Sequence, residues 1–543
     1  MPDLAGRLHE LKQRSGLSYA GLATRCGISA SAVHRYCRGQ VLPDSYGMVE
    51  RIARVCGAGR DELAELYRLW EHADAARSTA RGDAVPERVI GDAVADTEPA
   101  ARRASPRQRL RVVRWLGAVG CLLAVVMVGA TASSPVRHNA ARPEQNVPGP
   151  AWSQYPAAVP GSFYGVTVNS GSGAMPTFRV GAVRLWDSGS RWALVEPERG
   201  RYDWSVLDRL VDGARQVHLP VLYTFGGTPS WAAPDAPPGP YTDGSRAAPP
   251  DAVDDWVRFV RAVATRYAGR ITAYELWVLA PSPHFFTGDA ATLARMTQRA
   301  SAVIRRADPR ATVVCPSIGK LWEPPSRRFL RDFAAAGGYQ YCDAAGVKLY
   351  PRHEGDTPET FVGLGHVIDR TFHEAGVHPP LWDTGTTYRI PEDRPLDQAH
   401  AIAYAARFYL IGMYLRYERM YFYNWGGTKI PLVLQAVGGG PTAAARAVDR
   451  LQRWLTGARI TSCGHGHQDG LPGQVWECRY LLAAPHGGGP VPAVIRWTES
   501  GTAAMPADRG ARTVRSLDGT SGPAPRTLRI TEQPVLITLS SAG

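Results

Sequence analysis

Lysine is scarce in this chain of 543 residues. Only four of its 62 basic residues are lysines, namely Lys12, Lys320, Lys348 and Lys429, and arginine supplies the other 58. Enrichment in arginine, alanine and glycine is typical of a high-GC genome, so the net charge of +13 is weak evidence for nucleic-acid binding. The length predicts several domains, each able to bury its own core.

Charge is absent from one stretch, residues 115–136 (WLGAVGCLLAVVMVGATASSPV). This absence excludes an amphipathic surface helix, and about 20 apolar residues in a helix cross the hydrocarbon core of a bilayer. We therefore expect one transmembrane helix at 112–134, with the lipid bilayer as a partner. Arginines are concentrated before it, so the positive-inside bias places residues 1–114 in the cytoplasm and 137–543 outside the cell. A cleaved export signal, with a small-residue site at 130–132, is the alternative.

The eight cysteines include no paired CxxC motif, which argues against a zinc site. Three of them lie on the expected cytoplasmic side, where thiols stay reduced: Cys26, Cys37 and Cys56. On the outer side we expect a disulfide between Cys463 and Cys478, which for a loop of this length contributes about 3 kcal/mol. The same segment, CGHGHQD, offers a metal cluster of His465, His467 and Asp469 as the alternative. The disulfide is favoured, and neither a metal nor another cofactor is predicted.

Residues 1–76 are predicted to form a domain of short helices. Leu4, Leu8 and Leu11 recur at helical spacing, and Ser18 is suited to cap the second helix. The helices are followed by a flexible linker at 77–110, which lacks an apolar period.

The segment SYAGLATRCGISASAVHRYCRG resembles the helix-turn-helix of Xre/Cro-like repressors. The matching features are Leu22-Ala23, Gly27 at the turn, Ile28, Val33 and Gly39. The resemblance implies that the helix from Ser29 to Arg38 lies in the major groove. It assigns contacts with base edges or phosphates to Ser29, Ser31, His34 and Arg35, and phosphate contacts to Arg25 and Arg38. A helical protein-interaction module is the alternative, and a homodimer is possible.

From Phe163, short β-type runs alternate with amphipathic helical segments. Eight runs over about 300 residues predict a (β/α)₈ TIM barrel at 161–455, after an extracellular linker at 135–160. The runs are FYGVTV, AVRLWD, PVLYTFG, ITAYELWVL, TVVCPSIG, AAGVKLYP, PLWDTGT and RMYFYNWGG.

Several of these runs resemble clan A glycoside hydrolases, especially the xylosidase- and cellulase-like families. TAYELW is similar to their fourth strand and PLWDTGTTY to their seventh. The resemblance implies two catalytic glutamates about 5 Å apart, one as acid and one as nucleophile. Leu279 and Gly385 occupy the matching positions, and neither side chain can perform these steps. Asp383 and Glu354 are the fallback acids if the barrel is active.

Aromatic residues remain at the carboxyl ends of the predicted strands, where barrel sites form. Aromatic faces can stack on sugar rings, and one arginine can bond hydroxyl groups. The predicted sugar cleft comprises Arg184, Trp186, Trp231, Trp277, Tyr350, Trp382 and Trp425. Trp277 and Trp382 are equally suited to fill the barrel core.

Residues 456–543 contain repeated short strands with Gly/Pro turns and predict a β-sandwich. Three hypotheses for the whole chain follow. The first is a single-pass membrane protein with a cytoplasmic DNA-binding domain and an extracellular barrel that binds saccharide or cell-wall glycan without hydrolysing it. The second is an active membrane-anchored glycosidase with displaced carboxylates, and the third is a cell-wall adhesion module.

Overall fold

The computed structural model describes most of the chain outside the segment between the amino-terminal helices and the barrel. The described residues are 4–26, 30–43, 46–59, 62–63, 65–66, 69–70, 73, 151–353, 355–385, 396–427, 430–484 and 489–540.

The amino-terminal domain is a cluster of short helices around its own core. The helices are α1 (Leu4–Arg14), α2 (Tyr19–Cys26), α3 (Ala30–Cys37) and α4 (Tyr46–Val55). Leu8, Leu11, Leu22, Val33 and Ile52 are fully buried between them, as expected of apolar residues at helical spacing. The Oγ of Ser18 accepts a hydrogen bond from the Gly21 N–H at 3.0 Å, which caps α2 as predicted.

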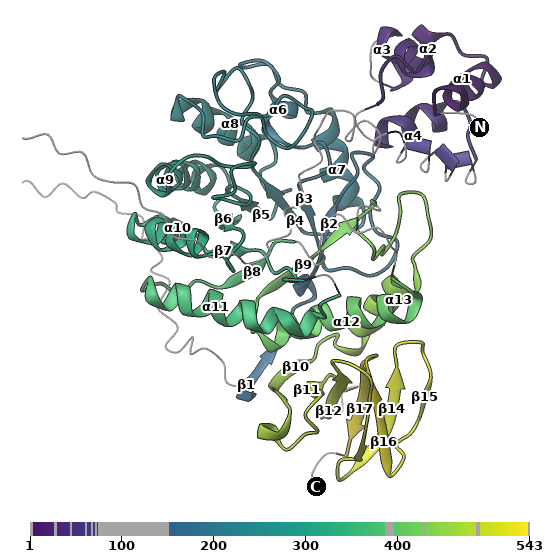
Figure 1. Ribbon diagram of the computed structural model, residues 1–543, viewed down its shortest axis with the longest axis vertical. Helices are drawn as coiled ribbons and strands as arrows, with labels where there is room; N and C mark the ends of the chain where they lie inside the picture. Colours follow the sequence, from purple (N-terminus) through teal and green to yellow (C-terminus); the bar gives the residue numbers. More distant parts are fainter. Residues whose placement is uncertain are drawn as a thin grey trace, which may run out of the picture.

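Eight parallel strands form a closed barrel, and seven longer helices surround it (Figure 1). The strands are β2 (Tyr164–Val168), β3 (Ala182–Leu185), β4 (Val221–Thr224), β5 (Ala273–Glu275), β6 (Thr312–Ile318), β7 (Ala344–Val347), β8 (Leu381–Asp383) and β9 (Arg419–Trp425). The surrounding helices are α7 (Ser205–Gln216), α8 (Val253–Arg266), α9 (Ala290–Ala307), α10 (Pro324–Ala335), α11 (Phe361–Glu374), α12 (Gln398–Tyr414) and α13 (Ala443–Trp454). The short helices are α6 (Trp192–Val195), η1 (Gly161–Phe163), η2 (Gly338–Tyr341) and η3 (Pro358–Thr360). The predicted (β/α)₈ architecture is confirmed.

The barrel interior is filled in layers. Residues in the first half of successive strands make the layer at the amino end: Ala182, Leu222, Ala273, Val314, Ala344, Trp382 and Tyr421. Because side chains alternate along a strand, Glu275 lies one layer above Ala273 and faces the same interior.

The carboxyl-terminal region is a seven-stranded sheet of order β1-β10-β11-β12-β17-β14-β15, with a two-stranded sheet of β13 and β16. Its strands are β10 (Arg459–His465), β11 (Val475–Leu482), β12 (Val491–Thr498), β13 (Thr502–Pro506), β14 (Ala511–Ser516), β15 (Ser521–Pro523), β16 (Thr527–Thr531) and β17 (Val535–Leu539), with η4 (His467–Asp469) after β10. Val494 and Ile537 of the larger sheet pack on Leu528 and Ile530 of the smaller one.

The first strand of this sheet, β1 (Ala151–Ala158), comes from the segment before the barrel. It falls within the expected linker at 135–160 and pairs antiparallel with β10. The segments directly before and directly after the barrel therefore both belong to this sheet. The contact is also polar, because Arg407 of α12 donates to the carbonyls of Thr498 and Glu499 at 2.7 and 2.8 Å.

Two disulfides are present among the described residues. Cys463 and Cys478 lie opposite each other on β10 and β11 and are joined, as expected from the sequence. A second disulfide joins Cys315 of β6 to Cys342, which follows η2. Cys26, Cys37 and Cys56 are buried free thiols in the helical domain.

The predicted fold class is corrected on one point, the membrane-spanning helix. No helix in the described ranges is long and apolar enough to cross a membrane. The longest, α9, carries four arginines, and the apolar face of α12 is covered by protein rather than lipid. The expected span at 112–134 lies outside the described residues. The predicted single-pass localisation, with lipid as a partner, rested on that helix and is withdrawn.

Candidate functional site

The second helix of the helix-turn-helix motif presents a polar face. Val33 is buried and Tyr36 packs against the domain core, while Ser31, His34 and Arg35 of α3 are exposed. Arg25 of α2 and Arg38, directly after α3, are also exposed. Ser29 lies outside the described residues.

The basic side chains on this face are available to a ligand. Within the described ranges, Arg25, Arg35 and Arg38 form no ion pair, whereas the nearby acidic residues are occupied elsewhere. Glu62 accepts hydrogen bonds from Arg14 at 2.6 and 2.8 Å, and these bonds together with the N–H of Gly59 lower its pKa to about 2. Glu62 therefore neutralises Arg14 of α1 and not the arginines on the exposed face of α3.

Tyr19 was not predicted as a site residue, although it contacts His34 on the exposed face of α3. Its ring lies edge-on to the ring of His34, with centroids 5.0 Å apart, and its hydroxyl is 3.3 Å from Nδ1 of His9. A tyrosine at the start of α2 is thus the link between α1 and the exposed histidine of α3.

At the carboxyl end of the barrel, the two positions that the sequence resemblance aligns with catalytic glutamates hold residues with positive φ angles. Leu279 has φ +51° and its N–H donates to Ser317 Oγ at 3.2 Å. Gly385 has φ +106°, a conformation that side-chain-bearing residues rarely adopt. A Cβ there would lie 3.2 Å from Thr167 Oγ1, so a glutamate at this position would require the backbone to change.

The interior beneath these positions contains a buried ion network centred on Glu275. Its carboxylate accepts from Arg184 Nε and Thr224 Oγ1 at 2.7 Å and from Thr384 Oγ1 at 2.8 Å, and Lys348 Nζ is 3.6 Å away. Burial alone would raise the pKa of Glu275, but the charges of Arg184 and Lys348 outweigh it and lower this pKa to about 2. Burial and the neighbouring Arg184 lower the pKa of Lys348. The carboxylate is consequently fixed in its charged form and has no proton to donate.

Asp383, a fallback acid, lies between Trp382 and Thr384, which both face the interior. It therefore faces the surrounding helices. It is fully buried, its Oδ1 accepts from the Leu349 N–H at 3.0 Å, and burial raises its pKa. Glu354, the other fallback acid, lies outside the described residues.

A second polar cluster, around Asp187 after β3, was not assembled from the sequence. Asp187 accepts from the hydroxyls of Tyr241 and Tyr423 at 2.9 and 2.6 Å, and Arg191 is 3.7 Å away. Tyr241 also accepts from Trp186 Nε1 at 2.9 Å. These bonds occupy the carboxylate with protein donors.

The structure does not bring the seven predicted sugar-cleft residues into one open surface. Arg184 belongs to the buried network, and Trp186, Trp277 and Trp425 are buried. Their indole N–H groups donate to Tyr241, to the carbonyl of Phe285 and to Gln435, respectively.

Trp382 lies in the layer at the amino end of the barrel. Trp231 and Tyr350, both on loops that follow strands, are partly exposed. The Arg199 guanidinium lies over the Trp231 ring, 5.0 Å from its centroid.

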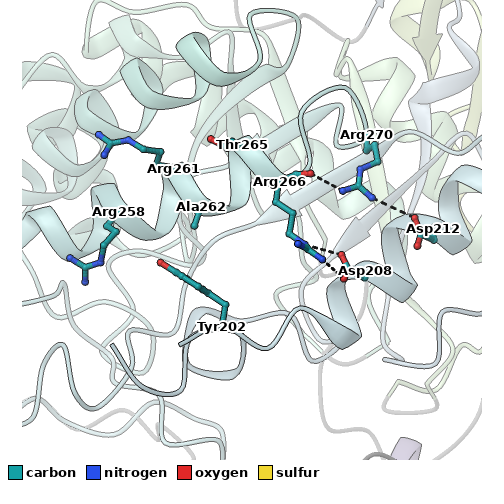
Figure 2. A pocket seen from close by; sticks show the side chains of 9 residues that line it. All are labelled: Tyr202, Asp208, Asp212, Arg258, Arg261, Ala262, Thr265, Arg266 and Arg270. Atoms are coloured by element: carbon teal, nitrogen blue, oxygen red, sulfur yellow. Dashed lines mark hydrogen bonds and ion pairs between the residues drawn. The ribbon is translucent and has the colours of Figure 1, made fainter. Parts of the chain in front are cut away.

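Figure 2 shows a separate hollow of about 790 Å³ between α7 and α8, on the outside of the barrel. Its arginines are mostly paired: Arg266 with Asp208 at 2.6 Å and Arg270 with Asp212 at 3.6 Å. These pairs bridge adjacent segments of the barrel wall and leave little net charge for a ligand.

The part of the chain that the structure describes contains no cluster of His, Cys, Asp or Glu suited to a metal ion. His465, which the sequence offered as a ligand, instead stacks on Trp476 with ring centroids 4.0 Å apart.

Comparisons with known proteins agree with both parts of this architecture. A family model described as a helix-turn-helix domain matches residues 3–66. A family 39 glycoside hydrolase from the gut symbiont Bacteroides cellulosilyticus WH2 aligns with a TM-score of 0.51 and 17% identity, over 67% of this chain and 76% of that chain. A glucosidase from Croceicoccus marinus aligns with a TM-score of 0.50 and 14% identity, over 72% of this chain and 98% of that chain. No curated protein sequence matches the chain.

The chain thus combines an amino-terminal helix-turn-helix domain with a (β/α)₈ barrel of the fold seen in glycoside hydrolases. At these identities the structural likeness concerns the fold alone. Both resemblances expected from the sequence are confirmed at this level.

Proposed function

We propose that the helix-turn-helix domain binds duplex DNA and that the barrel binds a saccharide without hydrolysing it. The chain would then act as a transcriptional regulator that responds to a sugar.

The non-catalytic part of this proposal rests on the resemblance to the clan A strand motifs, which aligns Leu279 and Gly385 with the acid and the nucleophile. Three described carboxylates, on the barrel strands or on the loop after β3, are already held by the protein itself. Glu275 is held by three hydrogen bonds, Asp187 accepts from two tyrosines, and Asp383 is buried on the outer side of β8. Without a positioned acid and nucleophile, binding stabilises the ground state and transition state alike and does not accelerate hydrolysis.

The saccharide part is supported by the glycoside-hydrolase fold and by the partial exposure of Trp231 and Tyr350 at the carboxyl end. We expect Trp231→Ala and Tyr350→Ala to weaken binding to the glycan that the full-length protein selects from an array. Tyr155→Ala is the matched control, because Tyr155 is 87% exposed on β1, remote from that end. If both variants bind as tightly as the wild type, the site is elsewhere. Glycan binding without any DNA binding would favour the adhesion hypothesis.

The DNA part is supported by the exposed Ser31, His34 and Arg35 of α3 and by the flanking cations Arg25 and Arg38. The full-length protein should select a duplex sequence from a random pool, with an affinity that falls steeply as salt rises. Arg35→Ala should cost about 1–3 kcal/mol of specific binding if the guanidinium contacts a base. Arg509→Ala removes the same charge from the carboxyl-terminal sheet region and should leave binding unchanged. Failure to enrich any sequence would favour a protein-interaction module.

A further inference from the structure

A second hollow lies at the amino end of the barrel, opposite the end at which the saccharide is proposed to bind. It has a volume of about 600 Å³ and lies between β1, η1, the end of α12 and the beginnings of β8 and β9. Small-molecule sites typically measure about 300–1,000 Å³, so this hollow is large enough for a monosaccharide or disaccharide.

The inner wall of the hollow is formed by Trp382 and two charged residues at the start of β9. The Arg419 guanidinium lies over the Trp382 ring, 4.2 Å from its centroid. The Trp382 Nε1 lies 3.4 Å from a carboxylate oxygen of Glu418. Trp382 therefore belongs to this hollow and not to the carboxyl-end cleft for which the sequence suggested it.

The outer wall repeats this arrangement. Trp152 of β1 is partly exposed, its Nε1 donates to the carbonyl of Tyr414 at 2.8 Å, and the Arg416 guanidinium lies 5.6 Å from its ring centroid. An indole beneath a guanidinium limits the positions that the arginine can adopt while its N–H groups can still donate in the guanidinium plane. Arg419 directs one of them to the Tyr421 hydroxyl at 3.5 Å.

The two arginines make no contact ion pair in the part of the chain that the structure describes, although the charge of Arg416 acts on the buried carboxyl of Asp369. Arg416 and Arg419 both line the same hollow. Asp343, the other acid of the lining, is held by Arg305 at 3.0 Å and by the Val313 N–H at 2.9 Å. The unmatched charge on the wall is thus positive.

We propose that the amino-end hollow binds a sugar acid. Arg416 and Arg419 would bind its carboxylate, for which a guanidinium offers two parallel N–H donors. Gln154 and Ser162, with the Glu418 carboxylate, would bond its hydroxyl groups. This site is separate from the carboxyl-end saccharide site and does not depend on it.

The test is isothermal titration of the full-length protein with sodium glucuronate, glucose and sodium benzoate. Glucuronate should bind at least tenfold more tightly than glucose, which lacks the carboxylate, and than benzoate, which lacks the hydroxyls. Arg416→Gln and Arg419→Gln should each weaken glucuronate at least fivefold, and Gln154→Ala on β1 should weaken it without changing the charge.

Two controls locate the binding. Arg261→Gln, on α8 at the separate hollow of Figure 2, and Trp231→Ala, at the carboxyl end, should both bind glucuronate like the wild type. Equal affinities for glucuronate and glucose, no saturable glucuronate binding, or unchanged binding by the Arg416→Gln/Arg419→Gln double variant would each overturn the proposal. Loss of binding in Trp231→Ala alone would assign the sugar acid to the carboxyl-end site instead.

Discussion

Replacing Glu275 by glutamine should destabilise the barrel strongly. The carboxylate is fully buried, accepts three hydrogen bonds of 2.7–2.8 Å, and is the acidic centre between Arg184 and Lys348. Glutamine keeps the shape but removes the charge, so Arg184 would lose its buried partner and the pKa of Lys348, already lowered by burial, would fall further. Removing one partner of a buried ion pair costs about 3–5 kcal/mol, and we expect a loss within this range.

The measurement is urea unfolding of the full-length protein, followed by tryptophan fluorescence, since the tryptophans lie mainly in the barrel and sheet. The control is Glu198→Gln, because Glu198 forms an exposed pair with Arg201 whose loss should cost no more than about 1 kcal/mol. Adding Lys348→Met to Glu275→Gln should recover part of the stability, since it removes a buried amino group that the Glu275 charge no longer stabilises. If the free energy of unfolding of Glu275→Gln lies within about 1 kcal/mol of that of the Glu198→Gln control, charge does not hold this network together.

Three further predictions concern stability. The pKa of Glu275 is lowered from 4.5 to about 2, so the stabilisation that its carboxylate provides is complete above pH 4.5 and is lost as the pH falls toward 2. The free energy of unfolding, measured as a function of pH, should decline in that window for the wild type but not for Glu275→Gln. Arg407→Met removes two hydrogen bonds to the sheet and leaves Glu359 buried without its cation. We therefore expect the free energy of unfolding to fall by about 3 kcal/mol and a protease to cleave faster between barrel and sheet. Protease resistance equal to that of the wild type would contradict this. Replacing Cys463 and Cys478 by alanine should cost about 3 kcal/mol, and an unchanged urea midpoint would show that the disulfide does not contribute.

Much of the fold follows from the local pattern of the sequence. The barrel strands are short apolar runs separated by amphipathic helices, and the helical domain has an apolar stripe with a capping serine. The sequence also predicts the absence of two catalytic glutamates, because the clan A resemblance aligns Leu279 and Gly385 with their positions, and this stays a prediction. These features depend on neighbouring residues, which the sequence displays directly.

The wrong predictions concern side-chain exposure and strand pairing, which are set by tertiary packing and not by the local sequence pattern. The exposure of Trp186, Trp277 and Trp425 depends on how the loops after the strands fold back over them, and these loops bury all three. Trp382 sits near a strand end in sequence, but β8 is only three residues long and its side chain faces the amino-end layer. The pairing of β1 with β10 joins segments about 300 residues apart and has no local signal.

The most direct test of the account is a turnover measurement at the carboxyl end of the barrel. The full-length protein is incubated at high concentration with chromogenic glucosides, xylosides and galactosides between pH 4 and pH 8, together with the glycan that it selects from an array. The account predicts saturable binding of that glycan and no product above the buffer background at any pH. Turnover that rises with protein concentration and is abolished by Asp383→Asn or Glu354→Gln, but not by Glu198→Gln, would contradict it and establish an active glycosidase.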